Sequence, residues 1–300
     1  MARRFSARSK TLSRKPRPEL AGQTDHALRG NYENIRADYT VDQDWAAYAP
    51  AEHDLWRRLY ARQSVLLPKF ACDEFIDILG ALDCSAGIPM FSVVNAQLKS
   101  ATGWQLVAVP GLLPDEMFFT HLANRRFPVT VWLRKPEEFD YIVEPDIFHD
   151  FFGHVPMLFN AMFADYLQAY GKGGVKAKGL DALDYLARLY WYTVEFGLIQ
   201  TPHGLRTYGA GILSSGGELP YGIESPQPHR LKFDLLRVMQ SKYKIDTFQE
   251  TYFVIDSFKQ LFDATAPDFT PYYEQLRSRP DIEANALIAG DVQVELALTA

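Results

Sequence analysis

Apolar residues recur at helical spacing through most of this 300-residue chain, and this period restricts the fold more than any other feature. One apolar face runs from residue 52 to 67 and is expected to end at Pro68, because proline disrupts a helix interior. Further helices are predicted to open at Pro114 and to cover 72–82, 93–102, 160–170, 180–199, 231–243 and 252–262. Strands are predicted over 104–109 and 127–133, and loops over the glycine-rich segments 171–174 and 208–221. The sequence thus predicts a mostly α (α+β) fold, a single helical domain with a few short strands.

Charge is unevenly distributed along the chain. Residues 1–20 hold seven basic side chains against one acidic one, so they carry +6 and leave −12 for the remainder, given the total of −6. We expect a disordered basic arm at 1–20, an irregular extension at 21–50, the functional domain at 51–280 and a tail at 281–300. A nucleic-acid-binding arm or an organelle-targeting peptide could have a similar composition. Because the remainder is acidic, no nucleic-acid partner is expected.

The cysteine content and the hydropathy favour a cytoplasmic protein. Cys72 and Cys84 are the only cysteines in the sequence, too few for a disulfide framework or a structural zinc site. No apolar run approaches the roughly 18 residues that cross a bilayer. We therefore expect a reducing, cytoplasmic environment and no membrane partner.

Two of the seven histidines, His149 and His154, stand close together in the sequence. Residues five apart on a straight α-helix point about 140° away from each other. A shared metal would therefore need the helix to end between them, and Gly153 could provide that end in a left-handed conformation. The alternative is two unrelated histidines, one buried and one capping a helix.

Glu195 is the best candidate for a third ligand. It lies near the end of a very apolar predicted helix, where a carboxylate is costly to bury unless it is paired or bound to a metal. The alternative is a solvated stripe on which Glu195 pairs with Arg188, although Trp191 makes that face aromatic. Two histidines and one carboxylate form the usual site for non-haem Fe(II), and also a hydrolytic zinc arrangement.

Four motifs resemble those of one known family. They are VPGLL (109–113), PDIFHDFFGHVP (145–156), YWYTVEFG (190–197) and YGAGILSS (208–215). Together they extend over roughly residues 55–270, in the order and at the spacing of the family. The chain resembles the pterin-dependent aromatic amino acid hydroxylases, and most closely the short bacterial members that hydroxylate phenylalanine.

This resemblance implies a helical catalytic domain that uses Fe(II), tetrahydrobiopterin or a related tetrahydropterin, and dioxygen as co-substrate. His149, His154 and Glu195 fall on the iron ligands, and Tyr190 has a weaker claim to a catalytic role. The implied substrate-binding positions are Arg134, Trp191, Phe196, Ser214 and Ile245. The positions implied at or near the pterin are Gly111, Leu112, Leu113, Phe118, Asp150, Ala187 and Glu218, with Phe118 stacked on the pterin ring.

Two charged residues, one before the histidine motif and one within it, have candidate roles. Arg134 suits recognition of the substrate carboxylate, because a guanidinium can donate two charge-assisted hydrogen bonds to it. Asp146 has two interpretations: a partner that orients the His149 imidazole, or a negative charge at a helix N-terminus.

The reaction implied is the conversion of L-phenylalanine to L-tyrosine, the first step of phenylalanine catabolism. Ile245 falls where tyrosine-hydroxylating members carry an acidic residue, and its apolar side chain favours an unsubstituted ring. A tyrosine or tryptophan hydroxylase, a His/His/Glu zinc hydrolase and a non-catalytic metal-binding protein stay open as alternatives. The flanking regions of the animal members have no obvious counterpart, so a monomer is expected.

Overall fold

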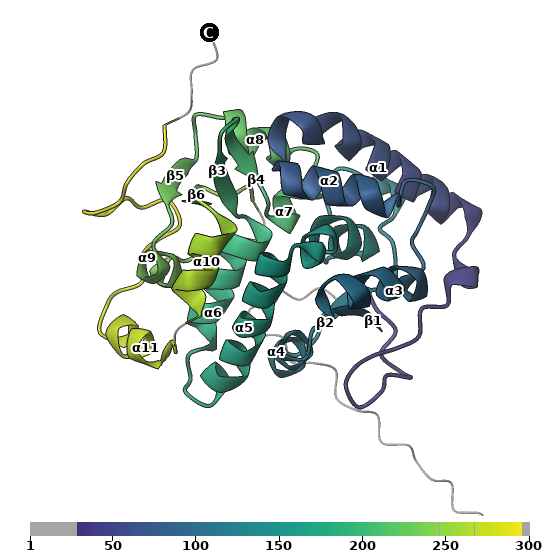
Figure 1. Ribbon diagram of the computed structural model, residues 1–300, viewed down its shortest axis with the longest axis horizontal. Helices are drawn as coiled ribbons and strands as arrows, with labels where there is room; N and C mark the ends of the chain where they lie inside the picture. The colour runs from purple at the N-terminus through teal and green to yellow at the C-terminus, as the bar shows by residue number, and fades with distance from the viewer. Residues whose placement is uncertain (1–28, 246, 267, 296–300) are drawn as a thin grey trace, which may run out of the picture.

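Helices make up most of the regular structure of this computed structural model, which describes residues 29–245, 247–266 and 268–295 (Figure 1). The α-helices are α1 (Pro50–Phe70), α2 (Asp73–Leu82), α3 (Phe91–Thr102), α4 (Asp115–Ala123), α5 (Ala161–Lys178), α6 (Leu183–Tyr190), α7 (Ala210–Leu213), α8 (Glu218–Glu224), α9 (Leu235–Gln240), α10 (Phe258–Thr265) and α11 (Thr270–Arg277). The short segments are the 3-10 helices η1 (Trp45–Ala47), η2 (Pro136–Glu138) and η4 (Pro156–Phe159), and the π-helical η3 (His149–His154) and η5 (Trp191–Glu195). The predicted basic arm at 1–20 lies outside the described residues.

The strands form two small sheets. Strands β1 (Gln105–Val109) and β2 (Arg126–Thr130) pair in parallel. The second sheet has the order β4-β3-β6-β5, with bounds Leu198–Thr201 for β3, Gly204–Thr207 for β4, His229–Lys232 for β5 and Thr251–Ile255 for β6. Strand β3 is antiparallel to β4 and parallel to β6, which is also parallel to β5. The predicted mostly helical fold with a few short strands is confirmed.

Two predicted helices begin as strands instead. The segment 252–262 contains β6 and then α10, and the segment 231–243 contains the end of β5 and then α9. All five residues of β6 are buried. A strand covered on both faces has a continuous apolar run that periodicity cannot distinguish from a buried helix. The run of Thr, Tyr, Phe, Val and Ile was the compositional signal for a strand.

The predicted loop at 171–174 is wrong, because α5 continues through it to Lys178. A Cβ atom on Gly171 would lie 2.4 Å from the Ala123 backbone nitrogen, and one on Gly174 would lie 1.9 Å from the Phe119 ring. These two glycines therefore allow α4 to pack closely against α5, beside which it lies in Figure 1. The predicted loop at 208–221 likewise contains α7 and the first half of α8.

Two predicted helix ends also differ from the structure. Pro68 does not stop α1, which ends at Phe70. In the last turn a proline removes one hydrogen bond, and burial of the neighbouring Leu67 and Phe70 side chains offsets that loss. The predicted helix 180–199 ends as α6 at Tyr190, continues as the π-helical η5, and gives way to β3.

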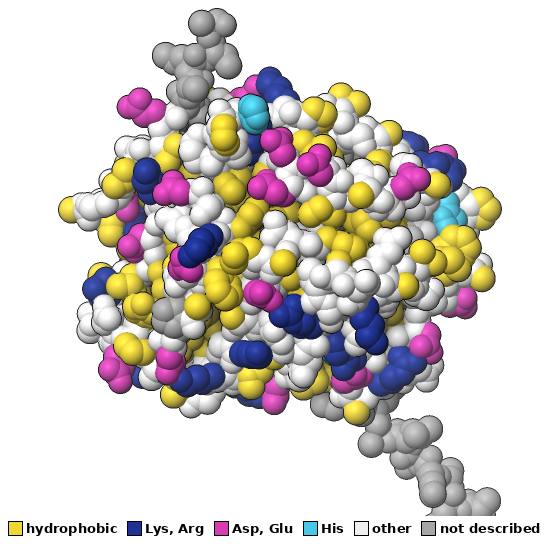
Figure 2. All heavy atoms as spheres, viewed as in Figure 1, with side chains coloured by type: hydrophobic (Ala, Val, Ile, Leu, Met, Phe, Trp, Pro, Cys, Tyr) yellow, Lys and Arg dark blue, Asp and Glu magenta, His cyan; other side chains and the backbone are white. Residues whose placement is uncertain are grey.

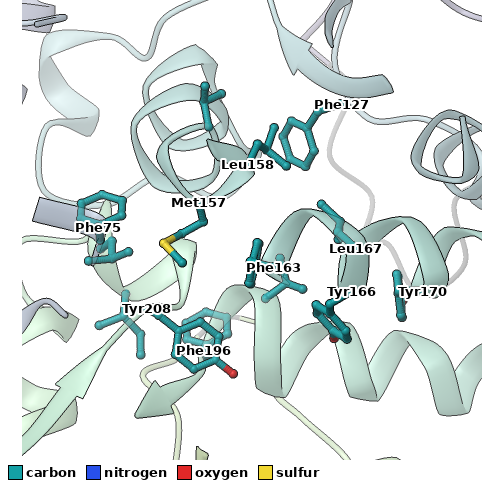
Figure 3. Packing of buried hydrophobic residues seen from close by; sticks show 14 of the residues in the cluster. Phe75, Phe127, Met157, Leu158, Phe163, Tyr166, Leu167, Tyr170, Phe196 and Tyr208 are labelled. Carbon is teal, nitrogen blue, oxygen red and sulfur yellow. The ribbon is translucent and has the colours of Figure 1, made fainter. Parts of the chain in front are cut away.

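Aromatic side chains fill the core around α5. Figure 3 shows Phe163, Tyr166 and Tyr170 along this helix, with Met157 and Leu158 of η4 across from them. Segment η4 directly follows η3, whose Phe151 and Phe152 are fully buried. The core thus fixes the end of η3 and holds its backbone in place.

On the face of the described residues seen in Figure 2, Lys and Arg side chains lie among acidic and uncharged ones. Within the described part of the chain, no helix combines the length and the apolar character that a membrane span requires.

Candidate active site

The π-helical segment η3 brings His149 and His154 together. A π-helix closes its hydrogen-bonded ring between residues five apart, so these two side chains leave nearly the same side of the segment. Their Nε2 atoms are 3.3 Å apart. The predicted left-handed turn at Gly153 is wrong, since this residue has no positive φ. A Cβ there would instead lie 2.8 Å from the Ala210 carbonyl oxygen, so glycine allows α7 to approach η3.

Glu195 completes the cluster from the last residue of the second π-helical segment, η5. Its Oε1 lies 3.2 Å from His154 Nε2, and its Oε2 lies 3.5 Å from His149 Nε2. The alternative of a solvated pair with Arg188 is wrong, because the Arg188 guanidinium binds Asp281 at 2.7 Å. The two histidines are therefore not unrelated, and all three side chains face one point.

The protonation states suit a metal ligand set. Burial lowers the pKa of His149 to about 4, so its imidazole is neutral at pH 7. Burial raises the pKa of Glu195, but the imidazoles of His154 and His149 outweigh it and the net shift is downward. Neutral imidazoles and an ionised carboxylate are the forms that bind a metal. Ligand atoms about 2.0–2.2 Å from one ion lie roughly 3–3.5 Å apart, and the three separations here fall in that range.

Asp150 is a second carboxylate near the two histidines. One of its oxygens lies within 4.8 Å of their ring nitrogens. Its Oδ2, however, accepts a hydrogen bond from the Thr130 N–H at 2.8 Å, and burial raises its pKa to about 7. Because the Glu195 carboxylate lies within 3.5 Å of both imidazoles and its pKa is lowered, it is the better candidate for the third ligand.

Ser214 orients the His149 ring. Its Oγ lies 2.9 Å from His149 Nδ1 and donates to the Ala210 carbonyl, also at 2.9 Å. The hydroxyl oxygen can therefore accept the Nδ1–H, which leaves the Nε2 lone pair directed toward Glu195. Asp146 does not perform this role, because its Oδ1 accepts the backbone N–H of His149 at 2.9 Å. The helix N-terminal interpretation of Asp146 is thus the correct one.

Arg134 and Asp146 form a fully buried ion pair beside η3. The Arg134 Nε and Nη2 atoms donate to the two Asp146 carboxylate oxygens at 2.8 and 2.9 Å. The Asp146 side chain is 0% exposed and that of Arg134 is 3% exposed. This pair fixes the position of the guanidinium relative to His149, since both contact the same carboxylate.

Aromatic side chains form one wall of the site, next to the candidate ligand residues and along η5. The Trp191 indole stacks on Tyr243 with ring centroids 4.4 Å apart, and it contacts Phe196 at 4.8 Å. At the end of α6, directly before η5, the Tyr190 ring lies 6.4 Å from His154 and packs edge-on against Phe118 at 5.4 Å. A flat, apolar ligand could therefore bind beside the three ligand side chains.

Comparison with known proteins decides the family. Residues 11–285 match the family model described as biopterin-dependent aromatic amino acid hydroxylase. The chain belongs to this family. Phenylalanine-4-hydroxylase of Ralstonia nicotianae is 57% identical over 282 residues, which cover 94% of this chain and 88% of that protein. Its counterpart from Chromobacterium violaceum is 61% identical over 256 residues, which cover 85% of this chain and 84% of that protein.

A solved structure of this family is also similar to the hydroxylase described here. It is the phenylalanine hydroxylase from Chromobacterium violaceum bound to cobalt, 58% identical, with a TM-score of 0.86 over 87% of this chain and 95% of that chain. The similarity confirms the catalytic-domain fold, and that relative binds cobalt.

The loop expected near the pterin follows β1 in this hydroxylase. Gly111 has a φ of +152°, and a Cβ there would lie 2.9 Å from the Tyr32 hydroxyl and 3.0 Å from Glu144 Oε1. The Tyr32 hydroxyl donates to the Leu112 carbonyl at 3.0 Å, while the Leu113 side chain is buried. The extension before α1 thus fixes this loop, a role for Tyr32 that sequence reasoning missed.

The remaining predicted residues lie farther from the ligand cluster. Ala187 is half-buried on α6, one turn before Trp191. Glu218, at the start of α8, is buried and accepts hydrogen bonds from Gln249 and Tyr252. Ile245 is 51% exposed, so the structure does not bury its side chain beside the three candidate ligand residues. The pterin and substrate contacts of these residues stay predictions.

Proposed function

We propose that this hydroxylase converts L-phenylalanine to L-tyrosine with dioxygen and a tetrahydropterin, at one Fe(II) ion held by His149, His154 and Glu195. The observation that carries the proposal is the convergence of two imidazoles and one carboxylate, whose potential ligand atoms lie 3.2–3.5 Å apart. The relatives from Ralstonia nicotianae and Chromobacterium violaceum are named phenylalanine-4-hydroxylases, which supports the choice of substrate. The reaction would be the first step of phenylalanine catabolism.

When they are bound, the metal and the tetrahydropterin together would activate dioxygen. The side chains of the protein hold and orient these groups and the substrate. Three ligands grouped on one side of an ion leave its opposite face open to small molecules. Ser214 keeps the Nε2 lone pair of His149 directed at the ion, and the core around η3 limits access of water. Orientation of the reacting groups is the main contribution that such a protein makes.

The substrate is proposed to bind between Arg134 and the aromatic wall. The guanidinium, already fixed by Asp146, would bind the amino acid carboxylate, and Trp191 and Phe196 would contact the ring. Fixing the carboxylate at one end of the site determines which ring carbon faces the metal. Phe118 and the 111–113 loop are proposed to hold the pterin on the other side of Tyr190, with Asp150, Ala187 and Glu218 nearby.

Product analysis with the three aromatic amino acids tests the proposal. The protein is loaded anaerobically with Fe(II), supplied with tetrahydrobiopterin and air, and the products are separated by chromatography. Tyrosine should form from phenylalanine, and the Zn(II)-loaded protein should be inactive. Hydroxylation of tyrosine or tryptophan in place of phenylalanine would contradict the proposed substrate, and turnover by the Zn(II) form would contradict the oxygenase assignment.

Three further proposals go with this function. Ile245 is proposed to favour an unsubstituted ring, and Ile245→Asp should shift the preference toward tyrosine at least tenfold in the same assay. An unchanged ratio in a folded, metal-loaded variant would remove Ile245 from the specificity residues. The enzyme is also proposed to be cytoplasmic and to be a monomer, and sedimentation of the full chain would test the monomer.

A further inference from the structure

A buried amide links the aromatic wall to the segment before β6. Gln249 is 3% exposed, and its Oε1 accepts a hydrogen bond from the Trp191 indole Nε1–H at 2.9 Å. Its Nε2 donates to the Lys244 carbonyl at 3.0 Å and to the Thr247 carbonyl at 3.4 Å. One side chain therefore joins η5 to two backbone positions in the segment between α9 and β6.

The backbone of Gln249 is also held in place, by a buried carboxylate. Its backbone N–H donates to Glu218 Oε1 at 3.0 Å, and the same oxygen accepts the Tyr252 hydroxyl at 2.7 Å. Glu218 is 6% exposed and Tyr252 is 0% exposed, so water competes little for these bonds. The amide of Gln249 thus has a defined position before it contacts the indole.

The hydrogen bond from Trp191 to Gln249 restricts a movement of the indole that its ring contacts allow. Stacking on Tyr243 and contact with Phe196 hold the plane of the indole, but apolar contacts tolerate sliding and rotation within that plane. A hydrogen bond from Nε1 restricts this rotation, because its geometry is directional. The neighbouring Tyr192 hydroxyl donates to the Lys242 carbonyl at 2.6 Å, so the same segment is attached to η5 a second time.

We propose that Gln249 is a positioning residue that fixes the Trp191 indole in the wall of the substrate site, so that affinity for the aromatic amino acid depends on its side-chain amide. The inference rests on the proposed function, in which Trp191 contacts the substrate ring. Glu218 acts one step farther away, through the backbone of Gln249. The side-chain amide forms its hydrogen bonds with Trp191, Lys244 and Thr247, whereas Glu218, which is proposed to lie near the pterin, contacts only the backbone N–H of Gln249.

The first test replaces the amide and measures kinetics. Gln249→Met keeps the length of the side chain and removes both its acceptor and its donors. In the Fe(II)-loaded enzyme this variant should raise the KM for L-phenylalanine about tenfold, while kcat and the KM for tetrahydrobiopterin change less than about threefold. Gln200→Met is the matched control, because Gln200 is exposed on β3 and donates only to the adjacent Thr201 carbonyl.

A double-mutant cycle separates positioning from a general loss of structure. Trp191→Phe keeps an aromatic ring but lacks the indole N–H, so Gln249→Met should have less than about a twofold further effect on KM in that background. Additive effects would overturn the proposal, as would an unchanged KM in the folded single variant. If Gln249→Met does not fold, Trp191→Phe alone decides: the proposal requires a severalfold higher KM for L-phenylalanine and an unchanged KM for the pterin.

Hydrogen exchange of the Trp191 indole N–H tests the positioning role independently of catalytic activity. In NMR spectra of the metal-free protein, the Trp191 indole N–H is the resonance missing from Trp191→Phe. Its hydrogen exchange should be slow in the parent protein and at least about tenfold faster in Gln249→Met. An unchanged exchange rate would overturn the positioning role. If the parent protein formed no tyrosine, the proposed function would be overturned. The exchange measurement would still test the positioning role, because it needs no turnover.

Discussion

His149 and His154 leave the same side of one π-helical segment, with their Nε2 atoms 3.3 Å apart. On an α-helix the same two positions would point about 140° apart, and no single ion could contact both. Glu195 comes from a second π-helical segment, η5. The convergence of these three side chains therefore depends on two local departures from α-helical geometry, each held by burial of its aromatic neighbours. Such departures occur often at functional sites.

Gly153→Ala should destabilise the protein, because the added Cβ would lie 2.8 Å from the Ala210 carbonyl. Relieving this contact requires α7 to move away from η3, at a cost of about 1–3 kcal/mol in the free energy of unfolding. Urea unfolding of the metal-free protein measures the loss. Gly80→Ala is the control: nothing lies within 4 Å of its added Cβ, and in the exposed interior of α2 it should stabilise by about 0.5–1 kcal/mol. Equal stability of Gly153→Ala and the parent would mean that close packing of α7 does not maintain η3.

Ser214→Ala should weaken metal binding. Without the Oγ that lies 2.9 Å from Nδ1, the His149 ring loses the contact that orients it, and affinity should fall about 10- to 100-fold. Competition with a chelating dye measures this affinity. Ser215→Ala is the matched control, because the Ser215 hydroxyl accepts the Glu218 N–H at the start of α8. This substitution should lower stability without changing the affinity for the metal. A Ser214→Ala protein with parental affinity would show that the ring is oriented by other contacts.

Arg134→Ala should lower stability strongly as well as weaken substrate binding. It leaves the carboxylate of Asp146 buried without its charged partner, which costs about 3–5 kcal/mol in the free energy of unfolding. Lys259→Ala removes a surface ion pair with Asp263 and should change stability little. Urea unfolding of both variants makes the comparison. Similar, small losses would indicate that water reaches Asp146 in the folded protein.

Glu218→Gln should change how stability depends on pH. Burial raises the pKa of the Glu218 carboxyl from 4.5 to about 7, so the folded state keeps a proton that the unfolded state releases between these values. The free energy of unfolding therefore falls as pH rises through this window, by about 2–3 kcal/mol between pH 5 and pH 8 from this group. Glutamine has no such dependence, so the variant should gain that amount relative to the parent over the same range. A pH-independent difference in urea unfolding would contradict a buried, protonated Glu218.

The sequence was sufficient to single out the three candidate ligand residues but not the geometry that brings them together. His149, His154 and Glu195 stood out because chemistry-bearing side chains were placed in apolar surroundings. The π-helical turn has no comparable signal, since it changes the hydrogen-bond partner and not the composition. Gly153 was therefore assigned to a left-handed turn, whereas its actual role is the close approach of α7.

Context-dependent residues account for the other errors. Gly171 and Gly174 resemble a loop in sequence, but they lie within α5 where α4 leaves no room for a side chain. Gln249 carried no signal at all, because a single glutamine acquires a role only from the partners that the fold places around it. Contacts between distant segments decide both cases, and these contacts are not encoded in local patterns.

The most direct test of the account is the metal content of a matched pair of amide variants, Glu195→Gln and Asp150→Asn. Each replaces one carboxylate near the histidines by an amide of nearly the same shape, and Asp150→Asn can still accept the Thr130 N–H. Each protein is loaded anaerobically with Fe(II), dialysed and analysed for iron. The account predicts about one ion per chain for the parent and for Asp150→Asn, and little or none for Glu195→Gln. Loss of iron from Asp150→Asn together with its retention in Glu195→Gln would contradict the ligand set proposed here.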